Sequence, residues 1–180
     1  MTIRPADPQR DGAACAAIYA PSVESTPTSF ELVPPDAAEF ARRISKYAAT
    51  HQFLVAEDGG EVVGYAYACR WGERAAYDWS VETSVYVAAG RHRRGIGRAL
   101  YAELFERLRA QGFRTAVARI TLPNPASIAL HEGIGFAPIG TLRDIGWKVG
   151  AWRDVGYWQL DLRPAGENAP DPPLRPGPDG

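Results

Sequence analysis

The chain has 180 residues and a mass of 19.6 kDa, which fits one ordinary domain because single cores rarely grow beyond about 250–300 residues. Hydrophobic residues make up 46% and charged residues 23%, proportions that argue against a disordered chain. Twenty basic and 21 acidic residues leave a formal net charge of −1, so the chain as a whole does not attract nucleic acid or anionic lipid. Any site for a polyanion must therefore be local.

Cysteine content and the N-terminal residues bear on the compartment. Two cysteines, Cys15 and Cys69, are too few for a disulfide scaffold, which favours a reduced, intracellular protein. The opening residues MTIRPAD contain a proline and an acid where a signal peptide needs an apolar stretch. No run approaches the roughly 20 apolar residues that span a bilayer. We therefore expect a cytoplasmic protein without a membrane partner.

The first predicted elements are two helices and a hairpin. Residues 11–20 place alanines and Ile18 on one side of a helix that Pro21 stops. Residues 37–47 predict a second, amphipathic helix, in which Phe40 and Ile44 lie four residues apart. Residues 53–57 and 61–68 read as strands on either side of Asp-Gly-Gly, which is a strong hairpin signal.

The remaining elements continue the alternation of strands and helices. A strand over 81–87 leads through a glycine-rich turn into a helix in which Ile96, Leu100, Leu104 and Leu108 recur every four residues. Gly112 then stands where a left-handed C-terminal cap would fall. A strand over 116–121, a helix over 125–132 and strands over 141–145 and 155–162 follow. The pattern predicts a single α/β domain with a mixed sheet.

The C-terminal segment differs in composition from the rest. Residues 164–180 contain six prolines and three glycines, and Leu174 is their one large apolar residue. Such a segment buries too little surface to offset the entropy lost on ordering. We therefore expect a folded domain over 1–163 and an extended or flexible tail over 164–180.

The turn before the third helix is the most informative segment. Residues 91–98 read RHRRGIGR and join a strand directly to an amphipathic helix. Backbone N–H groups at a helix start lack internal partners, and the helix dipole favours negative charge there. Gly95 and Gly97 lack Cβ atoms, so a ligand oxygen can approach the main chain closely. These features predict a cradle for a phosphate or pyrophosphate.

Two common phosphate-binding motifs are excluded. Leu100 stands where the dinucleotide fingerprint requires its third glycine, and no G-x-x-x-x-G-K-[ST] run is present. For the four basic residues 91–94, a solvated basic turn and contact with nucleic acid remain as alternatives. The strand before the turn and the helix after it favour the phosphate cradle.

This turn resembles the acyl-CoA pyrophosphate loop of the GCN5-related N-acetyltransferase (GNAT) superfamily, written Q/R-x-x-G-x-G/A. Within the superfamily the chain is similar to the phosphinothricin N-acetyltransferases and related amino-acid acetyltransferases. His92 departs from the motif because it stands at the Q/R position. The resemblance covers nearly all of residues 1–163 and extends through FLVAE (53–57), AYDW (76–79), ETSVYV (82–87), LPN (122–124), HE (131–132), GF (135–136), WK (147–148) and WRDVGYWQ (152–159).

The resemblance implies a fold, a cosubstrate and a substrate class. The fold would be a mixed, mostly antiparallel sheet with splayed central parallel strands and flanking helices. Acetyl-CoA would donate an acetyl group, without a metal, to the α-amine of a small amino acid or analogue such as phosphinothricin, methionine sulfone or methionine sulfoximine. Related enzymes are commonly homodimers. The expected coenzyme-binding residues are Val85, Tyr86, Val87, Arg93, Arg94, Gly95, Ile96, Gly97, Arg98, Asn124 and Ser127.

Acetyl transfer to an amine requires a group that accepts the ammonium proton. Glu82 is the candidate base, because it lies on the strand that feeds the loop, on the face opposite Val81 and Thr83. It would act directly or through a water. The alternative from the pattern alone is a solvent-facing strand glutamate. The resemblance favours the base, since the related enzymes place an acid near the amine at this position.

The departing thiolate requires a proton donor. His131 follows Asn124 by seven residues, so both lie on one face of the predicted helix. In the superfamily this position often holds a tyrosine that protonates the thiolate, and the asparagine contacts the coenzyme arm. His131 is therefore a catalytic candidate, as the acid or as a group that orders water near the amine. The alternatives are a satisfied helix histidine and an asparagine that only caps the helix.

Recognition of an amino-acid acceptor requires a cation for its carboxylate, and an arginine fork suits it best. Arg74 is the candidate, and Phe30, Tyr77 and Trp79 are expected to wall the pocket; the alternative is that these aromatic residues belong to the core. Residues 146–158, with their tryptophans, favour a dimer interface or an active-site rim.

Two functional classes are consistent with these residues. The first is an N-acetyltransferase in which the amine attacks directly within a ternary complex, because neither cysteine lies in the cleft segments and no G-x-S-x-G motif is present. Its acceptor is a small amino acid or, as the alternative, a peptide or protein. The second class is a non-catalytic acyl-CoA-sensing module, which would keep the loop and lack a competent base.

Overall fold

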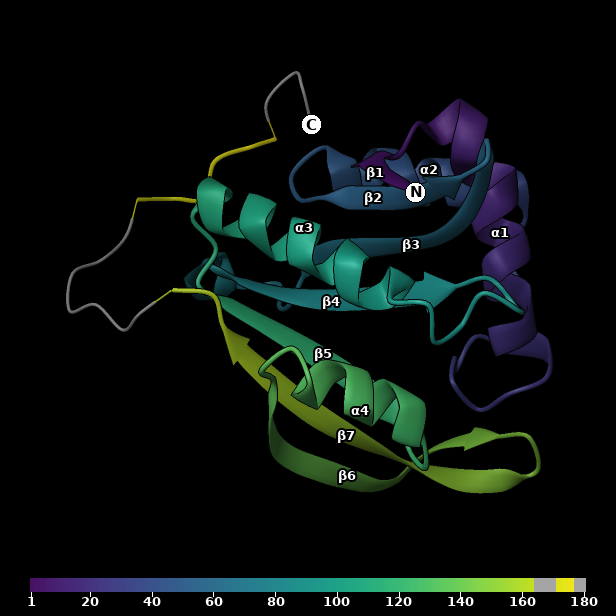
Figure 1. Cartoon of the computed structure of the whole chain (residues 1–180). Coiled ribbons are helices and arrows are strands. Elements are labelled where there is room, and N and C mark those ends of the chain that lie inside the picture. Colours follow the sequence, from purple (N-terminus) through teal and green to yellow (C-terminus); the bar gives the residue numbers. More distant parts are fainter. Residues whose placement is uncertain (164–170, 177–180) are drawn as a thin grey trace.

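The computed structural model describes residues 1–163 and 171–176, so most of the predicted tail lies outside the described residues. One seven-stranded sheet has the order β1-β2-β3-β4-β5-β7-β6, with helices on both faces (Figure 1). A 3₁₀ turn, Ala75–Tyr77, precedes β4. The elements are β1 (Thr2–Pro5), α1 (Pro8–Glu24), α2 (Ala37–Ala48), β2 (Phe53–Asp58), β3 (Glu61–Arg70), β4 (Ser80–Val87), α3 (Ile96–Gln111), β5 (Thr115–Thr121), α4 (Pro125–Glu132), β6 (Ala137–Lys148) and β7 (Ala151–Asp161).

Within the described ranges only β4 and β5 run parallel; every other neighbouring pair of strands is antiparallel. Their pairing covers three positions and ends at Glu82 opposite Val117, although β4 continues to Val87 and β5 to Thr121. The two strands therefore diverge toward the loop that precedes α3. The predicted mixed sheet with a splayed central parallel pair is confirmed.

Two hydrophobic cores lie on opposite faces of the sheet. On one face α3 buries Leu100, Leu104 and Leu108 completely, in the same cluster as Phe136 and Trp158. On the other face α1 and α2 pack over β2 and β3. The four-residue spacings predicted for α2 and α3 thus mark the faces that these helices turn toward the sheet.

Helix α1 differs from its prediction because it continues through Pro21 to Glu24. A proline inside a helix removes one donor, which normally ends the helix. Here Tyr19 and Val23, on either side of the proline, are both buried in the second core. Packing of the last turn therefore outweighs the lost hydrogen bond.

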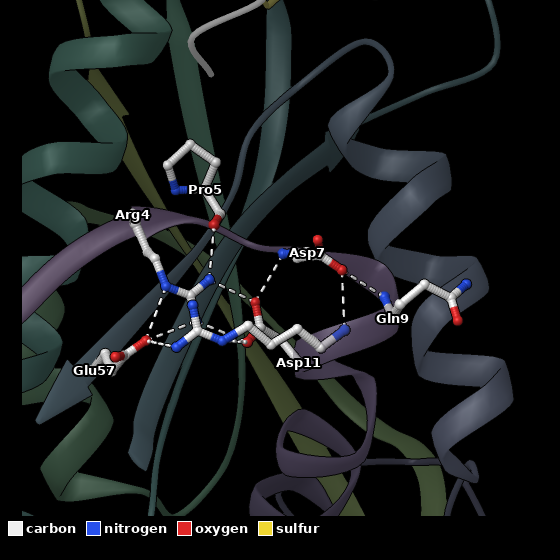
Figure 2. A network of polar contacts seen from close by, with 7 residues as sticks. Arg4, Pro5, Asp7, Gln9, Asp11 and Glu57 are labelled. Carbon is white, nitrogen blue, oxygen red and sulfur yellow. Dashed lines mark hydrogen bonds and ion pairs between the residues drawn. The ribbon is translucent and has the colours of Figure 1, made fainter. Parts of the chain in front are cut away.

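Strand β1 was not predicted, and side-chain contacts hold it in place (Figure 2). Arg4 of β1 donates to both carboxylate oxygens of Asp11 in α1, at 2.7 and 2.8 Å, and to Oε2 of Glu57 in β2, at 2.9 Å. The Asp11 side chain is 0% exposed and also accepts the Asp7 amide. This network joins three elements that neither periodicity nor turn signals connect.

The described part of the C-terminal segment lies against the domain. The Leu174 amide donates to the Gln111 carbonyl at 2.7 Å, and the Trp79 indole donates to the Asp171 carbonyl at 2.8 Å. In Figure 1 this segment runs beside the end of α3, at the opposite end of the sheet from the β4–α3 loop. None of the helices in the described ranges is long and apolar enough to cross a membrane.

Candidate active site

The loop between β4 and α3 adopts a conformation suited to an anion. Arg93 and Gly95 have positive φ angles of 60° and 78°, and Gly95 is the N-cap of α3 in the left-handed region. Glycine adopts this region without the steric cost that a Cβ imposes. Gly95 offers no side chain to cap the helix, so the amides of residues 96–98 are available to a ligand.

The second glycine of the motif has a packing role. A Cβ on Gly97 would lie 3.2 Å from Leu130 Cδ2, so its absence lets α3 approach α4 closely. On Gly95, in contrast, a Cβ would meet no protein atom within 4 Å. The two glycines therefore serve different purposes, although the motif alone suggested the same purpose for both.

The basic residues of the loop divide into anchors and free charges. Arg91 forms ion pairs with Asp58 and Glu61 in the neighbouring hairpin. His92, at the departing motif position, donates from Nε2 to the Val87 carbonyl at 3.0 Å, so its ring closes the loop internally. The side chains of Arg93 and Arg94 are exposed and have no protein partner among the described residues. These two arginines supply the positive charge that remains for a ligand.

The Arg98 side chain points neither to the β2–β3 hairpin nor to solvent alone, but to the end of α4. A Cβ built on Gly133 would lie 2.9 Å from its Nη2, so the guanidinium lies against the C-terminal end of α4. A cation is favoured at a helix C-terminus by the helix dipole.

A cavity of about 60 Å³ occupies the splay between β4 and β5. Beyond Glu82, β4 pairs only with β3, and beyond Val117, β5 pairs only with β7, so the facing backbone edges are unpaired among the described residues. A larger, shallow depression of about 480 Å³ lies across α3, near Ile3 and Phe105, and contains none of the predicted site residues. The smaller cavity is lined by Thr28, Thr83, Ser84, Val85, Tyr86, Tyr101, Arg119, Ile120, Thr121, Asn124, Ser127 and His131.

His131 lies in this cavity wall and is only 4% exposed. Its Nδ1 is 2.7 Å from the Ser127 carbonyl, which can only accept, so Nδ1 carries the hydrogen. Its Nε2 is 3.0 Å from the Tyr101 hydroxyl and therefore accepts from it. Burial lowers the pKa of His131 below its usual value and thus favours the neutral ring. The proton shared between the two residues therefore belongs to the Tyr101 hydroxyl, which is the one donor of this pair.

Tyr101 was not identified from the sequence. Its position in the α3 stripe predicts a core residue, and its ring is indeed fully buried. Burial raises the pKa of its phenol, which keeps the proton on the oxygen. The contact with His131 joins residues 30 positions apart in the chain, so no local pattern could reveal it. The signal that existed was a hydroxyl-bearing residue in an otherwise apolar stripe.

Asn124 and Ser127 combine two roles in the same wall. Asn124 caps α4 by accepting the Ser127 amide at 3.1 Å, as the capping alternative predicts, and both residues also line the cavity. Val85 and Tyr86 line the cavity from β4, whereas Val87 lies at the strand end next to the loop.

Glu82 lies at the last position at which β4 pairs with β5, and its carboxylate forms an ion pair with an arginine. Its side chain is 16% exposed, and its Oε1 accepts from Arg119 Nε at 2.8 Å, with Nη2 2.7 Å away. Arg119 extends from β5, is about half exposed and lines the cavity. It too was missed, because a single strand arginine carries no sequence signal. The pair links the candidate base to the cavity.

Phe30 lies at the rim of this region. Its ring lies over Gly146 of β6, where a Cβ would come within van der Waals overlap of the ring carbons. The α1–α2 segment that carries it is held by the Thr121 hydroxyl, which donates to the Thr28 carbonyl at 3.3 Å. Thr28 of this segment lines the cavity, whereas Phe30 does not, so the acceptor-side role of Phe30 stays a prediction.

The structure does not bring Arg74, Tyr77 or Trp79 into the cavity lining. Arg74 is exposed before the 3₁₀ turn, and its guanidinium has no protein partner in the described ranges. Trp79 is tied to the Asp171 carbonyl, away from the β4–α3 loop. Likewise, among the described residues no cluster of His, Cys, Asp or Glu could hold a metal ion.

The comparisons agree with this geometry. A family described as acetyltransferase (GNAT) domain matches residues 6–156. Phosphinothricin N-acetyltransferase from Streptomyces viridochromogenes is 42% identical over 176 residues, covering 98% of this chain and 94% of that protein. L-methionine sulfoximine/L-methionine sulfone acetyltransferase from Pseudomonas aeruginosa is 38% identical over 150 residues, covering 82% and 87%.

Among solved structures, a phosphinothricin acetyltransferase from Sinorhizobium meliloti in complex with acetyl-CoA matches with a TM-score of 0.90 and 37% identity. The match covers 97% of this chain and 95% of that one. The predicted superfamily is thereby confirmed. The chain belongs to the acetyltransferase (GNAT) family.

Proposed function

We propose that the protein is an acetyl-CoA-dependent N-acetyltransferase that acts on the α-amine of a small amino acid or analogue. Phosphinothricin and the methionine sulfone and sulfoximine class are the first candidates, because the relatives named above carry those names. The observation that supports the proposal best is the cavity in the β4–β5 splay. It has the Tyr101–His131 pair in one wall and Arg119, bonded to Glu82, in another.

Several features of this chain fit the coenzyme. The uncapped amides of residues 96–98, with Arg93 and Arg94, would hold its diphosphate. The unpaired edge of β4 from Val85 to Val87 offers backbone partners to the amide groups of the coenzyme arm. Asn124 and Ser127 would form the opposite wall. Acetyl-CoA supplies the activated acetyl group.

Glu82, which does not itself line the cavity but is bonded to Arg119 in its wall, and Tyr101 carry the two proton transfers in this proposal. Glu82 accepts the proton of the incoming ammonium, directly or through a water, on the side where its Oε2 has no protein partner among the described residues. As the thioester breaks, the Tyr101 hydroxyl turns its single proton from His131 Nε2 to the departing sulfur. His131 is a positioning residue in this account, because both ring nitrogens bond to protein atoms and Nε2 orients the phenol. General acid–base groups typically contribute about 10²–10⁴-fold.

We also propose that the protein is a cytoplasmic homodimer. The β6–β7 hairpin forms the edge of the sheet and exposes large apolar side chains, including Ile145, Trp147 and Trp152 at 54%, 59% and 60% exposure. Exposed edges and apolar patches of this kind favour association. Both cysteines are free, which suits a reducing compartment.

The test is release of free thiol from acetyl-CoA in the presence of a panel of amino acids, methionine sulfone and phosphinothricin. We expect acceptor-dependent release with at least one of them. Glu82→Gln should lower kcat by about 10²-fold or more while acetyl-CoA binding persists. Unchanged turnover in that variant would remove Glu82 from the mechanism. If the protein binds acetyl-CoA but none of these acceptors causes thiol release, a protein acceptor or a sensing module would be favoured.

A further inference from the structure

The Glu82–Arg119 pair leaves one atom of each partner unengaged. Both Arg119 contacts, from Nε and Nη2, go to the same oxygen, Oε1 of Glu82. Glu82 Oε2 and Arg119 Nη1 have no protein partner among the described residues. The pair therefore presents a free carboxylate oxygen of Glu82 next to a free N–H group of Arg119, at the point where β4 and β5 separate.

The surroundings of the pair form a shaped site on one sheet face. In the strand register Cys69 lies opposite Glu82 and Tyr157 lies opposite Arg119, so these four side chains project from the same face. Cys69 thus borders the candidate base, contrary to the expectation that neither cysteine lies in the cleft segments, but burial raises the pKa of its thiol to about 12 and disfavours the thiolate. The Trp71 ring packs edge-on against Tyr157, with centroids 6.0 Å apart. A charged pair with an apolar and aromatic border suits a small polar ligand that carries both charges.

A zwitterionic amino acid has the complementary arrangement. Its ammonium and carboxylate are attached to the same carbon, so one molecule can contact both members of an adjacent ion pair. A carboxylate binds the planar guanidinium fork through two parallel hydrogen bonds. Arg119 lines the cavity that also contains Tyr101 and His131, so a carboxylate held by it would keep the neighbouring amine close to the splay.

We propose that Arg119 binds the acceptor carboxylate while Glu82 receives its ammonium, which makes Arg119 the residue that selects amino acids. This inference rests on the proposed function and names the determinant of its substrate class. When the acceptor is absent, Arg119 occupies one oxygen of the base. The acceptor carboxylate draws the guanidinium away, and both oxygens of Glu82 then become available to the ammonium proton.

A purely stabilising role accounts for the pair less well. Arg119 is about half exposed, and ion pairs at such positions add little to stability. Arg74, which the sequence pattern favours for the carboxylate, lies outside the cavity lining. Of the arginines in the described residues, Arg119 alone lines this cavity.

The test compares methionine sulfone with the matching amine that lacks the carboxylate. The wild type should acetylate methionine sulfone with much the higher kcat/KM. Arg119→Gln should raise KM for methionine sulfone by about 10–100-fold, which is the scale of charge-assisted hydrogen bonds. The kcat/KM of Arg119→Gln for the amine without a carboxylate should equal or exceed that of the wild type, because Arg119 no longer occupies an oxygen of Glu82. Acetyl-CoA affinity should not change, and Arg119→Lys should restore part of the preference.

Two further variants complete the comparison. Arg42→Gln removes the same charge from α2, where Arg42 pairs with Glu39 at the surface, and should leave both substrates unaffected. If Arg119→Gln changes both substrates equally, Arg119 serves only Glu82 and the proposal is wrong. It is also wrong if Arg74→Gln, rather than Arg119→Gln, abolishes the preference.

Direct binding separates this inference from the proposed function. Methionine sulfone should bind the wild-type protein saturated with CoA in a calorimetric titration, and Arg119→Gln should weaken that binding by a similar factor. Weakened binding together with no thiol release from the wild type would contradict the acetyltransferase proposal but support the carboxylate site. Equal binding to the two proteins, or none to either, would overturn the Arg119 assignment whatever the activity.

Discussion

The buried network around Asp11 yields a quantitative prediction for stability. Asp11→Asn removes the negative charge without creating a cavity. The replaced carboxylate is 0% exposed and accepts from both Nη atoms of Arg4 and from the Asp7 amide. Breaking a buried ion pair costs about 3–5 kcal/mol. Because Arg4 keeps its contact with Glu57, we expect a value near the lower end, about 3 kcal/mol. For a chain of this length that corresponds to a fall in Tm of about 6–12 °C.

Thermal and urea unfolding followed by circular dichroism would measure this change. Glu106→Gln is the matched control, because it breaks a solvent-exposed pair with Arg109 on α3 and should leave Tm almost unchanged. If Asp11→Asn has the same Tm as this control, the network does not hold β1 and α1 to the sheet.

The Asp11–Arg4 pair also predicts how the stability difference between the wild type and Asp11→Asn depends on pH. Burial would raise the pKa of Asp11, but the Arg4 and Asp7 hydrogen bonds outweigh it and hold the pKa below its usual value. A carboxyl whose pKa is lower in the folded state contributes stability above its unfolded value, about 3.9, and loses it as pH falls through the folded value. The advantage of the wild type over Asp11→Asn should therefore be constant near pH 7 and shrink below about pH 4. A difference that grows in acid would contradict this assignment.

Three predictions concern the site and the assembly. Gly95→Ala should weaken CoA binding about tenfold in calorimetry, because alanine is strained at φ +78° and its Cβ would occupy the open space at the helix start where the ligand is expected. The control is Gly60→Ala in the β2–β3 turn, where φ is +85°. It imposes the same strain, about 1–2 kcal/mol, away from the loop and should leave CoA affinity unchanged. Tyr101→Phe should lower kcat about 10²-fold with unaltered coenzyme affinity, and equal turnover would exclude the phenol as a donor. Trp152→Glu should convert the dimer to monomers in sedimentation velocity; an unchanged sedimentation coefficient would place the interface elsewhere, or show that no dimer forms.

Local patterns were sufficient for the elements whose determinants lie close together in the chain. The spacing of Phe40 and Ile44 identified the buried face of α2, and helix α4 has the predicted bounds of 125–132. Gly112 caps α3 with φ +101°, as its position after the apolar stripe predicted. The loop at 91–98 was also evident, because the strand, the glycines and the helix start are consecutive.

The rest depends on contacts between distant residues, and those exist only in the folded chain. Packing of Tyr19 and Val23 carries α1 through Pro21, and the Arg4 network holds a strand with no periodicity of its own. The Glu82–Arg119 pair joins residues 37 positions apart, on two strands whose parallel pairing no turn signal announces. Short-range spacing thus revealed which segments carry the chemistry. Which side chains meet in the cavity was set by the divergence of β4 and β5, a property of the whole sheet.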